Sequence, residues 1–179
     1  GCLDRPTAGR YLLGGEDVAA ADDRRLSHIR NEKIGFVFQS FQLVPHLTVI
    51  ENVELPLFYR RIPRGKRRKS CLEIIDRVGL SHRIDHLPSE MSGGENQRAA
   101  VARALSADPT IILADEPTGN LDTATSVEIM KLFESLHEAG RTIVMITHDP
   151  EIAAAAPRRV MLRDGLIESD TALETGAPA

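Results

Sequence analysis

The sequence has no tryptophan, few aromatic residues and only two cysteines among its 179 residues. Cys2 and Cys71 have neither metal-ligand spacing nor the pattern of a disulfide framework, so a reducing cytosol is expected. No apolar run approaches the roughly 20 residues that span a bilayer. The formal net charge of −4 gives no general reason to expect nucleic acid or an anionic membrane as a partner. The chain length and a content of 42% hydrophobic residues predict one ordinary globular domain.

The stretch Thr110–Glu116 (T-I-I-L-A-D-E) passes directly from a continuous apolar run to two adjacent carboxylates. An unbroken aliphatic run predicts a parallel strand that is covered on both faces. In open α/β sheets, ligands bind at the carboxyl ends of the strands, where Asp115 and Glu116 would lie. Two neighbouring charges favour a cation or a substrate there. Taken alone, however, the two residues are equally compatible with a simple cap on the turn at Pro117.

Two further runs predict strands that end in polar side chains at the same edge of the sheet. Lys33–Gln39 ends in Gln39. The apolar run Arg141–Thr147 predicts another buried parallel strand and is followed by His148. A glutamine at a strand end is usually a surface amide, and a lone histidine is usually structural. Each becomes a candidate site residue because it would lie beside the two carboxylates. The pattern predicts an α/β fold with a parallel core sheet.

The sequence also predicts a capped helix whose first residues suit an anion. Ser92 and Glu95 have the S-x-x-E spacing of a capping box, and Ala99–Ala107 is rich in helix formers. Gly93 and Gly94 would let a ligand approach the backbone closely. Free N–H groups and the helix dipole would favour a phosphate. An ordinary capped helix is the alternative.

Other patterns predict secondary structure without indicating a function. The expected elements are a short strand at Arg10–Leu13 before a Gly14-Gly15 turn, a polar helix at Asp22–Arg30, a helix capped by Thr48, a helix at Cys71–Val78 ended by Gly79, a helix at Ser126–Glu138 ended by Gly140, and a hairpin at Arg159–Glu168 with its turn at Asp164-Gly165. The apolar positions expected in the Ser126–Glu138 helix are Val127, Ile129, Met130, Phe133 and Leu136. The basic run Arg60–Lys69 lacks interleaved aromatic residues, which favours a solvated loop and helix start over a nucleic-acid surface. The tail from Ser169 is expected to fray.

Together these motifs resemble those of the ATP-binding cassette (ABC) ATPases. In chain order they are Gln39, S-G-G-E-N-Q-R at Ser92–Arg98, I-I-L-A-D-E-P-T at Ile111–Thr118, N-L-D at Asn120–Asp122 and T-H-D at Thr147–Asp149. One such motif could arise by chance, whereas five in the family's order over nearly the whole chain are highly specific. The run from Gly35 to Leu57 is similar to the macrolide-export and lipoprotein-release group.

The resemblance implies a P-loop NTPase-like domain that binds ATP and Mg²⁺. It implies a single ABC ATPase domain over residues 1–179, with a helical signature subdomain inserted at residues 41–106. By this resemblance, Gln39 contacts Mg²⁺ and the attacking water and links the site to the membrane partner, while Asp115 holds Mg²⁺ through water and Glu116 is the general base. His148 contacts the γ-phosphate. Ser92, Gly93 and Gly94 bind the γ-phosphate of the nucleotide held by the opposite subunit, and Asp122 lies at the dimer interface. These roles agree with the needs of phosphoryl transfer.

The resemblance further implies a homodimer of ATPase subunits bound to a transmembrane permease at the cytoplasmic face of the cell membrane, with no nucleic-acid partner. The interval between Gln39 and Ser92 has room for a compact helical subdomain but not for a long coiled coil, which argues against a DNA-repair protein. A translation factor of this family would normally repeat the cassette, and this chain has one copy. Export or lipoprotein release is therefore preferred to a soluble, non-transport role. The transported substrate and the permease are not identified by the sequence.

Two departures from the family pattern accompany the resemblance. Glu95 stands where many members have glutamine, which the capping box accommodates. The phosphate loop G-x-x-x-x-G-K-[ST] is expected just before Gly1–Pro6 and does not occur in the sequence, which begins with glycine instead of methionine. The expectation is a family member without its N-terminal strands and phosphate loop. For residues 1–179 taken alone, no specific nucleotide binding and marginal folding are therefore expected. A truncated, catalytically inactive product is the alternative function.

Overall fold

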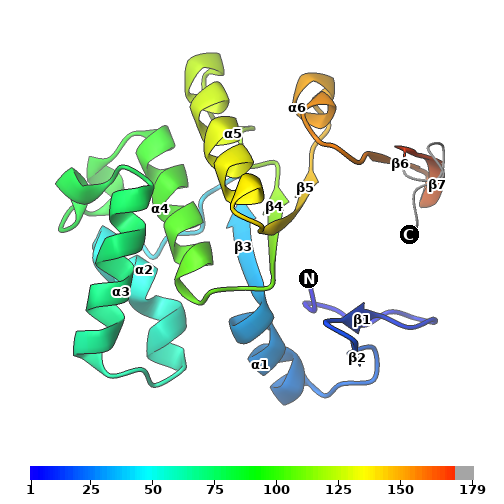
Figure 1. Ribbon diagram of the computed structural model, residues 1–179, viewed down its shortest axis with the longest axis horizontal. Helices are drawn as coiled ribbons and strands as arrows, with labels where there is room; N and C mark the ends of the chain where they lie inside the picture. Colours follow the sequence, from blue (N-terminus) through cyan, green and yellow to red (C-terminus); the bar gives the residue numbers. More distant parts are fainter. Residues whose placement is uncertain (172–179) are drawn as a thin grey trace. The chain divides into compact units, whose positions relative to one another are not determined.

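A computed structural model describes residues 1–171, and the chain divides into two compact units between Ile146 and Thr147. The first unit contains a three-stranded parallel sheet, shown in Figure 1, in the order β3 (Ile34–Phe38), β4 (Ile111–Asp115) and β5 (Thr142–Ile146). The apolar stretch before the two carboxylates is therefore the central strand. In the register of the sheet, Asp115 pairs with Phe38 on one side and with Ile146 on the other. The carboxyl ends of all three strands consequently meet at one edge, as the sequence predicts.

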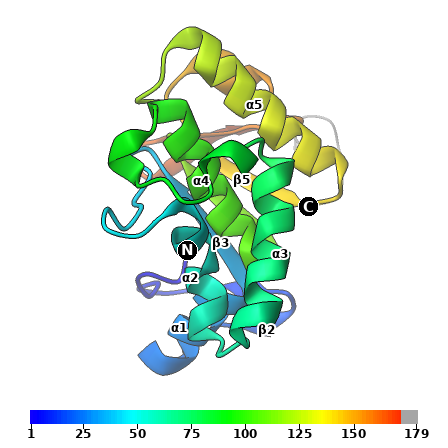
Figure 2. The same cartoon turned by 90° about the vertical axis from the view of Figure 1, so that its left-hand side faces the viewer.

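Five helices and a small hairpin complete the first unit. The helices are α1 (Asp23–Lys33), α2 (Val49–Tyr59), α3 (Arg64–Arg77), α4 (Gly93–Ser106) and α5 (Thr123–Glu138), with 3₁₀ turns at Ser81–Arg83 and Pro88–Glu90 and a hairpin of β1 (Leu12–Leu13) and β2 (Glu16–Asp17). Figures 1 and 2 show α2, α3 and α4 packed on one another as a group, with α4 nearest the sheet. The predicted helix starts at Thr48 and Ser92 are confirmed, and both are complete capping boxes.

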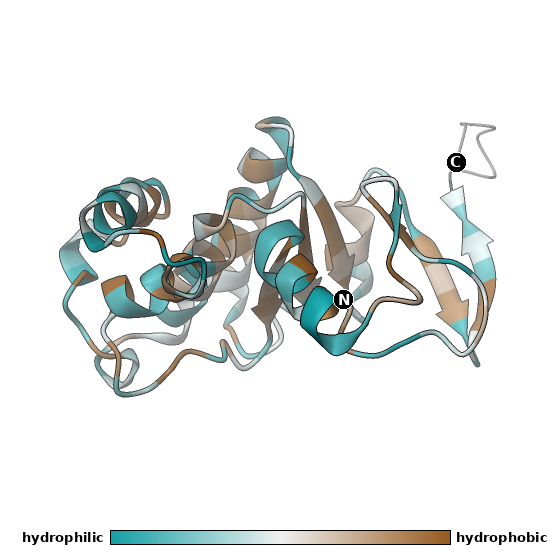
Figure 3. Cartoon of the chain, turned by 90° about the horizontal axis from the view of Figure 1, so that it is seen from below, coloured by the Kyte–Doolittle hydropathy of each residue, from teal (hydrophilic) through white to brown (hydrophobic). Residues whose placement is uncertain are grey.

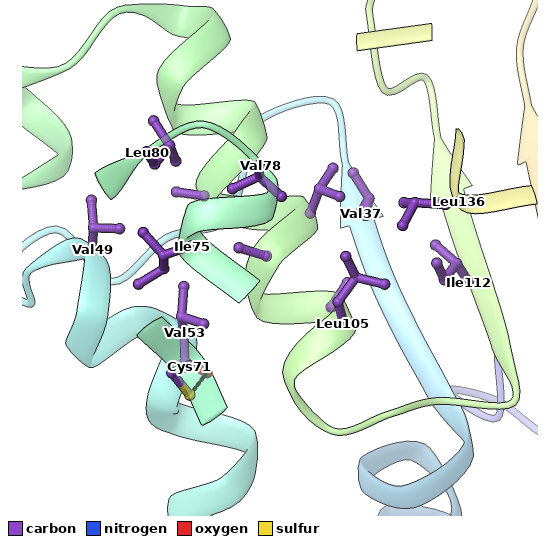
Figure 4. Close-up of a cluster of buried hydrophobic side chains, with 14 of the residues drawn as sticks. Val37, Val49, Val53, Cys71, Ile75, Val78, Leu80, Leu105, Ile112 and Leu136 are labelled. Carbon is purple, nitrogen blue, oxygen red and sulfur yellow. Dashed lines mark hydrogen bonds between the residues drawn. The ribbon is translucent and has the colours of Figure 1, made fainter. Parts of the chain in front are cut away.

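A continuous hydrophobic core joins the helical group to the sheet. In Figure 4, Val53 of α2 and Ile75 of α3 lie between these two helices, and Val37 and Ile112 extend from the strands toward α4. All four side chains are almost completely buried. Figure 3 shows the same distribution, with hydrophobic residues along the strands of the first unit. This packing joins α2, α3 and α4 to the strands of the sheet.

The prediction that β4 is covered on both faces is only half right. Ile112 and Ala114 are fully buried against the helices, whereas Ile111 and Leu113 on the other face are only partly buried. That second face packs against a smaller core formed by the β1–β2 hairpin and α1. The prediction that β5 is buried is wrong for the described residues, because its side chains alternate between exposed and half-buried. Within residues 1–171, β5 pairs only with β4 and lies at the sheet edge.

Several predicted boundaries and one predicted core residue also differ from the structure. The first strand is shorter than expected and consists of Leu12–Leu13. Helix α5 begins at Thr123, three residues earlier than expected, because Asp122 caps it. Val127 on α5 is 49% exposed, so it does not belong to the buried face. The basic run enters helix α3 at Arg64, in agreement with its interpretation as a loop and helix start.

The second unit consists of a short helix and a hairpin. Its elements are α6 (Pro150–Ala154), β6 (Val160–Arg163) and β7 (Leu166–Asp170). The predicted Asp164-Gly165 turn is confirmed, and both residues have the positive φ of a tight hairpin turn. The predicted fraying from Ser169 is not seen at Ser169 and Asp170, which belong to β7, or at Thr171, whose N–H donates to the carbonyl of Arg159 at 3.0 Å. The prediction for residues 172–179 lies outside the described residues. Among residues 1–171, no helix is both long enough and apolar enough to cross a membrane.

Candidate functional site

The sheet edge in the first unit brings three of the predicted site residues together. Asp115 is the last residue of β4 and is exposed, and Glu116 follows it and is half-buried. Gln39 directly follows Phe38, the residue that pairs with Asp115 in the sheet. A carboxylate pair and an amide therefore lie at the carboxyl ends of adjacent parallel strands, which is where ligands bind in open α/β sheets.

Glu116 has an unusual backbone conformation, with a φ of 46°. Residues other than glycine adopt the left-handed region rarely and at a free-energy cost. The backbone hydrogen bonds of Glu116 hold it there, because its N–H donates to the carbonyl of Ile146 at 2.9 Å and its carbonyl accepts from the N–H of Gly119 at 3.1 Å. Strain of this kind is typically found at functional sites.

Gln39 is attached to the turn that follows the carboxylates. Its Nε2 donates to Oδ1 of Asn120 at 3.2 Å, and Nδ2 of Asn120 donates to the backbone carbonyl of Gln39 at 3.1 Å. The Gln39 side chain lies directly over Gly119, where an added Cβ would be 2.6 Å from Nε2. The paired amides and the absence of a side chain at Gly119 together fix Gln39 beside the carboxylate pair.

Arg103 of α4 stabilises the turn that follows Gln39. Phe41 and Gln42 both have positive φ, at 61° and 51°. The guanidinium of Arg103 donates to the backbone carbonyls of both residues, at 3.0 Å for Phe41. A charged donor on two consecutive carbonyls offsets the strain of this turn. The turn after β3 is therefore attached to α4.

The start of α4 is held by a closed set of hydrogen bonds. Oγ of Ser92 accepts from the N–H of Glu95 at 3.2 Å, and the Glu95 carboxylate accepts from the N–H of Ser92 at 2.8 Å. Nε of Arg83 also donates to Glu95, at 2.8 Å. The backbone hydrogen bond from Ser92, followed by that from Arg83, lowers the pKa of Glu95 to about 2. Glu95 is therefore ionised over the whole physiological pH range.

The two glycines at the start of α4 lie against the segment that follows the carboxylates. A Cβ on Gly93 would be 3.2 Å from Cδ2 of Leu121, and a Cβ on Gly94 would be 2.5 Å from Cγ2 of Thr125. The second distance is shorter than any normal carbon contact. Gly94 therefore allows α4 and α5 to approach closely, in addition to any role toward a ligand.

Asp122 and His148 belong to different parts of the structure. Asp122 caps α5, where its carboxylate accepts from the N–H of Thr125 at 3.0 Å and from Oγ1 of Thr125 at 2.6 Å. The hydrogen bonds from Thr125 lower the pKa of Asp122. His148 follows β5 and lies in the second unit, so its placement near the carboxylates stays a prediction.

Three residues of this region were not proposed as site residues from the sequence, although two of them lie within the quoted motifs: Gln97, Arg103 and Asn120. Gln97 is completely buried, and its Nε2 donates to the carbonyl of Pro117 at 2.6 Å. A signal for Gln97 was present, because it is four residues before Val101 and therefore lies on the apolar face of α4. No sequence pattern indicates the contacts of Arg103 and Asn120, because their partners are distant in the sequence. Arg103 donates to the carbonyls of Phe41 and Gln42, and Asn120 is paired with Gln39.

The described residues are compatible with a magnesium ion that is bound mainly by phosphate oxygens and water and by few protein side chains. Among residues 1–171, no group of three or more His, Cys, Asp or Glu side chains is arranged to hold a metal ion. Mg²⁺ in phosphoryl-transfer sites is usually bound by one or two carboxylates and completes its shell with phosphate oxygens and water. The exposed carboxylate of Asp115 suits this mode of binding. Glu116 follows it directly in the chain, and a carboxylate is a group that can orient or deprotonate water.

Comparison with known proteins identifies relatives along most of the chain. The family model described as "ABC transporter" matches residues 2–119. An uncharacterised ABC transporter ATP-binding protein of Thermotoga maritima is 54% identical over 168 residues, which are 94% of this chain and 72% of that protein. The macrolide export ATP-binding/permease protein MacB of Chlorobium luteolum is 50% identical over 170 residues. That match covers 95% of this chain but only 26% of MacB.

Solved structures give the same similarity in three dimensions. The dimeric post-hydrolysis structure of the ATP-binding cassette MJ0796, bound to ADP and Pi, is 44% identical to this chain and superposes with a TM-score of 0.84. The match covers 94% of this chain and 75% of that cassette. At this identity, the likeness extends beyond a shared fold.

Proposed function

This chain belongs to the ABC transporter ATPase family, and we propose that it is the ATP-hydrolysing subunit of an exporter or a lipoprotein-release system. Members of the family bind ATP through this domain, and the cassette structure similar to this chain contains ADP and Pi. The observation that supports the proposal most strongly is the end of β4. There, Asp115 and Glu116 leave the sheet beside Gln39 and close to the capped start of α4.

The proposed catalytic roles follow from the chemistry of the side chains at this edge. Asp115 would hold Mg²⁺ through water, and the ion would supply positive charge to offset the negative charge on the transferred phosphoryl group. Glu116 accepts a proton from the attacking water as the general base. Gln39 orients that water with its amide and contacts the metal. His148 is proposed to contact the γ-phosphate.

The start of α4 is proposed to bind the nucleotide of a second subunit. The cap uses Oγ of Ser92 as an acceptor, which leaves the hydroxyl proton able to bond a phosphate oxygen. The N–H groups of Gly93 and Gly94 add donors at the positive end of the helix dipole. Asp122, which caps α5 beside Gly94, is proposed to lie at the same dimer interface. The dimeric structure of the similar MJ0796 cassette supports the existence of a dimer.

A transmembrane permease is the second proposed partner. The MacB relatives are named as ATP-binding/permease proteins, and this chain covers about a quarter of their length. We propose one ATPase domain over residues 1–179 with a helical subdomain at residues 41–106, and a link from the site to the permease through Gln39. The protein would then act at the cytoplasmic face of the cell membrane, and no nucleic acid is expected to bind.

The transport function is tested by replacing Glu116 with glutamine in the full-length protein in its own cells. For macrolide export, the variant lowers the concentration of erythromycin that stops growth. For lipoprotein release, lipoproteins accumulate in the membrane that they normally leave. If ATP hydrolysis is lost in the purified variant and both cellular measurements stay at the wild-type level, the transport proposal is wrong.

A further inference from the structure

The side chain of Gln97 connects two parts of the site that are far apart in the sequence. Gln97 lies in the second turn of α4 and is completely buried. Its Nε2 donates a short hydrogen bond, 2.6 Å, to the carbonyl of Pro117. Its Oε1 is buried and has no hydrogen-bond partner among the described residues. A buried amide with one unsatisfied atom costs free energy, so an apolar residue would suit this position better on packing grounds alone.

The bond from Gln97 acts directly next to the strained residue of the site. Glu116 has positive φ, and a conformation of this kind persists only when its surroundings hold it. The Glu116 N–H is bonded to Ile146 and its carbonyl to Gly119, both through backbone groups. The neighbouring carbonyl, that of Pro117, is bonded to the side chain of Gln97. Of these three hydrogen bonds, only the one from Gln97 is donated by a side chain, so it alone can be removed by a side-chain substitution.

We propose that Gln97 is a positioning residue for ATP hydrolysis, which acts by fixing the backbone of Glu116 and Pro117. The inference rests on the proposed role of Glu116 as the general base. Through this bond, the helix that begins with Ser92 is attached to the peptide that carries the base. Loss of the bond leaves the buried carbonyl of Pro117 without its donor, and the Glu116 carboxylate moves away from the position of the attacking water.

The first experiment measures backbone hydrogen exchange in the full-length protein, and it does not depend on catalysis. Gln97→Met keeps the length and volume of the side chain but removes the donor. The expected result is amide exchange at least about tenfold faster in the peptide from Glu116 to Asn120. Asn96→Leu is the matched control, because Asn96 is also buried on α4 but donates to Pro88 and Met91. Unchanged exchange in Gln97→Met, or equal acceleration in the control, would overturn the proposal.

The second experiment separates positioning from general damage through the kinetics. Gln97→Met should lower kcat for ATP by about 10- to 100-fold, with KM unchanged, because Gln97 is not expected to touch the nucleotide. In a Glu116→Gln background the same substitution should cause no further loss, because the group it positions is already gone. A rise in KM with kcat unchanged, or an additive loss in the double variant, would overturn the proposal. If the wild-type protein itself shows no hydrolysis, the proposed function fails, and the exchange measurement still decides the role of Gln97.

Discussion

At the scale of the residue, the missing Cβ of Gly94 allows α4 to approach α5 closely. Gly94 faces Cγ2 of Thr125, and that side chain cannot easily rotate away because its Oγ1 donates to Asp122 at 2.6 Å. Threonine also has few allowed rotamers in a helix. The contact gives Gly94 a packing role that is independent of nucleotide binding, and the two roles can be separated by experiment.

Gly94→Ala is expected to lower the free energy of unfolding of the full-length protein by about 1–3 kcal/mol, through overpacking against Thr125. Adding Thr125→Ser removes the obstructing methyl group, keeps the hydroxyl for Asp122, and should restore most of the loss. Urea unfolding measures both effects. Gly65→Ala in α3 is the control, because a Cβ there would meet no atom within 4 Å. Full stability of Gly94→Ala would show that the glycine has no packing role.

Element types were predictable from the sequence, whereas contacts between elements were not. The helix starts at Thr48 and Ser92 follow from capping boxes, in which both partners lie within four residues. The burial of β4 and β5 was overestimated, because an apolar run does not reveal which neighbours cover each face. The same limit explains why Gln39, Asp115 and Glu116 could be proposed from strand ends, while the bond from Gln97 to Pro117 could not.

The cap of α4 gives stability that depends on pH. The pKa of Glu95 is lowered from 4.5 to about 2, so its contribution is complete above the unfolded-state value and is lost as the pH falls toward 2. Between about pH 5 and pH 2, this carboxylate should account for up to about 3 kcal/mol of the decrease in unfolding free energy. In Glu95→Gln, the unfolding free energy should therefore decrease less between these two pH values than in the wild type.

Urea unfolding at about pH 6 and about pH 3 measures this difference. The matched control is Glu73→Gln, which replaces an exposed carboxylate on α3 and should leave the pH dependence of the wild type unchanged. If Glu95→Gln loses as much stability in acid as the wild type, the ion pair with Arg83 and the cap do not stabilise α4.

At the scale of the whole molecule, the proposed site is completed by a second subunit. Ser92→Arg should block ATP-driven dimerisation of the full-length protein, because a long charged side chain would occupy the position of the partner's phosphate. Sedimentation velocity with and without ATP measures the dimer. Ser135→Arg, which alters an exposed serine far along α5, is the control and should still form dimers. An ATP-dependent dimer of unchanged stability in Ser92→Arg would contradict the role of this motif.

The central claim, that the end of β4 performs ATP hydrolysis, is tested most directly by Glu116→Gln in the full-length protein. The substitution keeps the size of the side chain and leaves Asp115 in place, but it removes the base. The account predicts steady-state hydrolysis slower by about 100-fold or more, with ATP affinity close to that of the wild type in a titration. Hydrolysis within about tenfold of the wild-type rate would contradict the account.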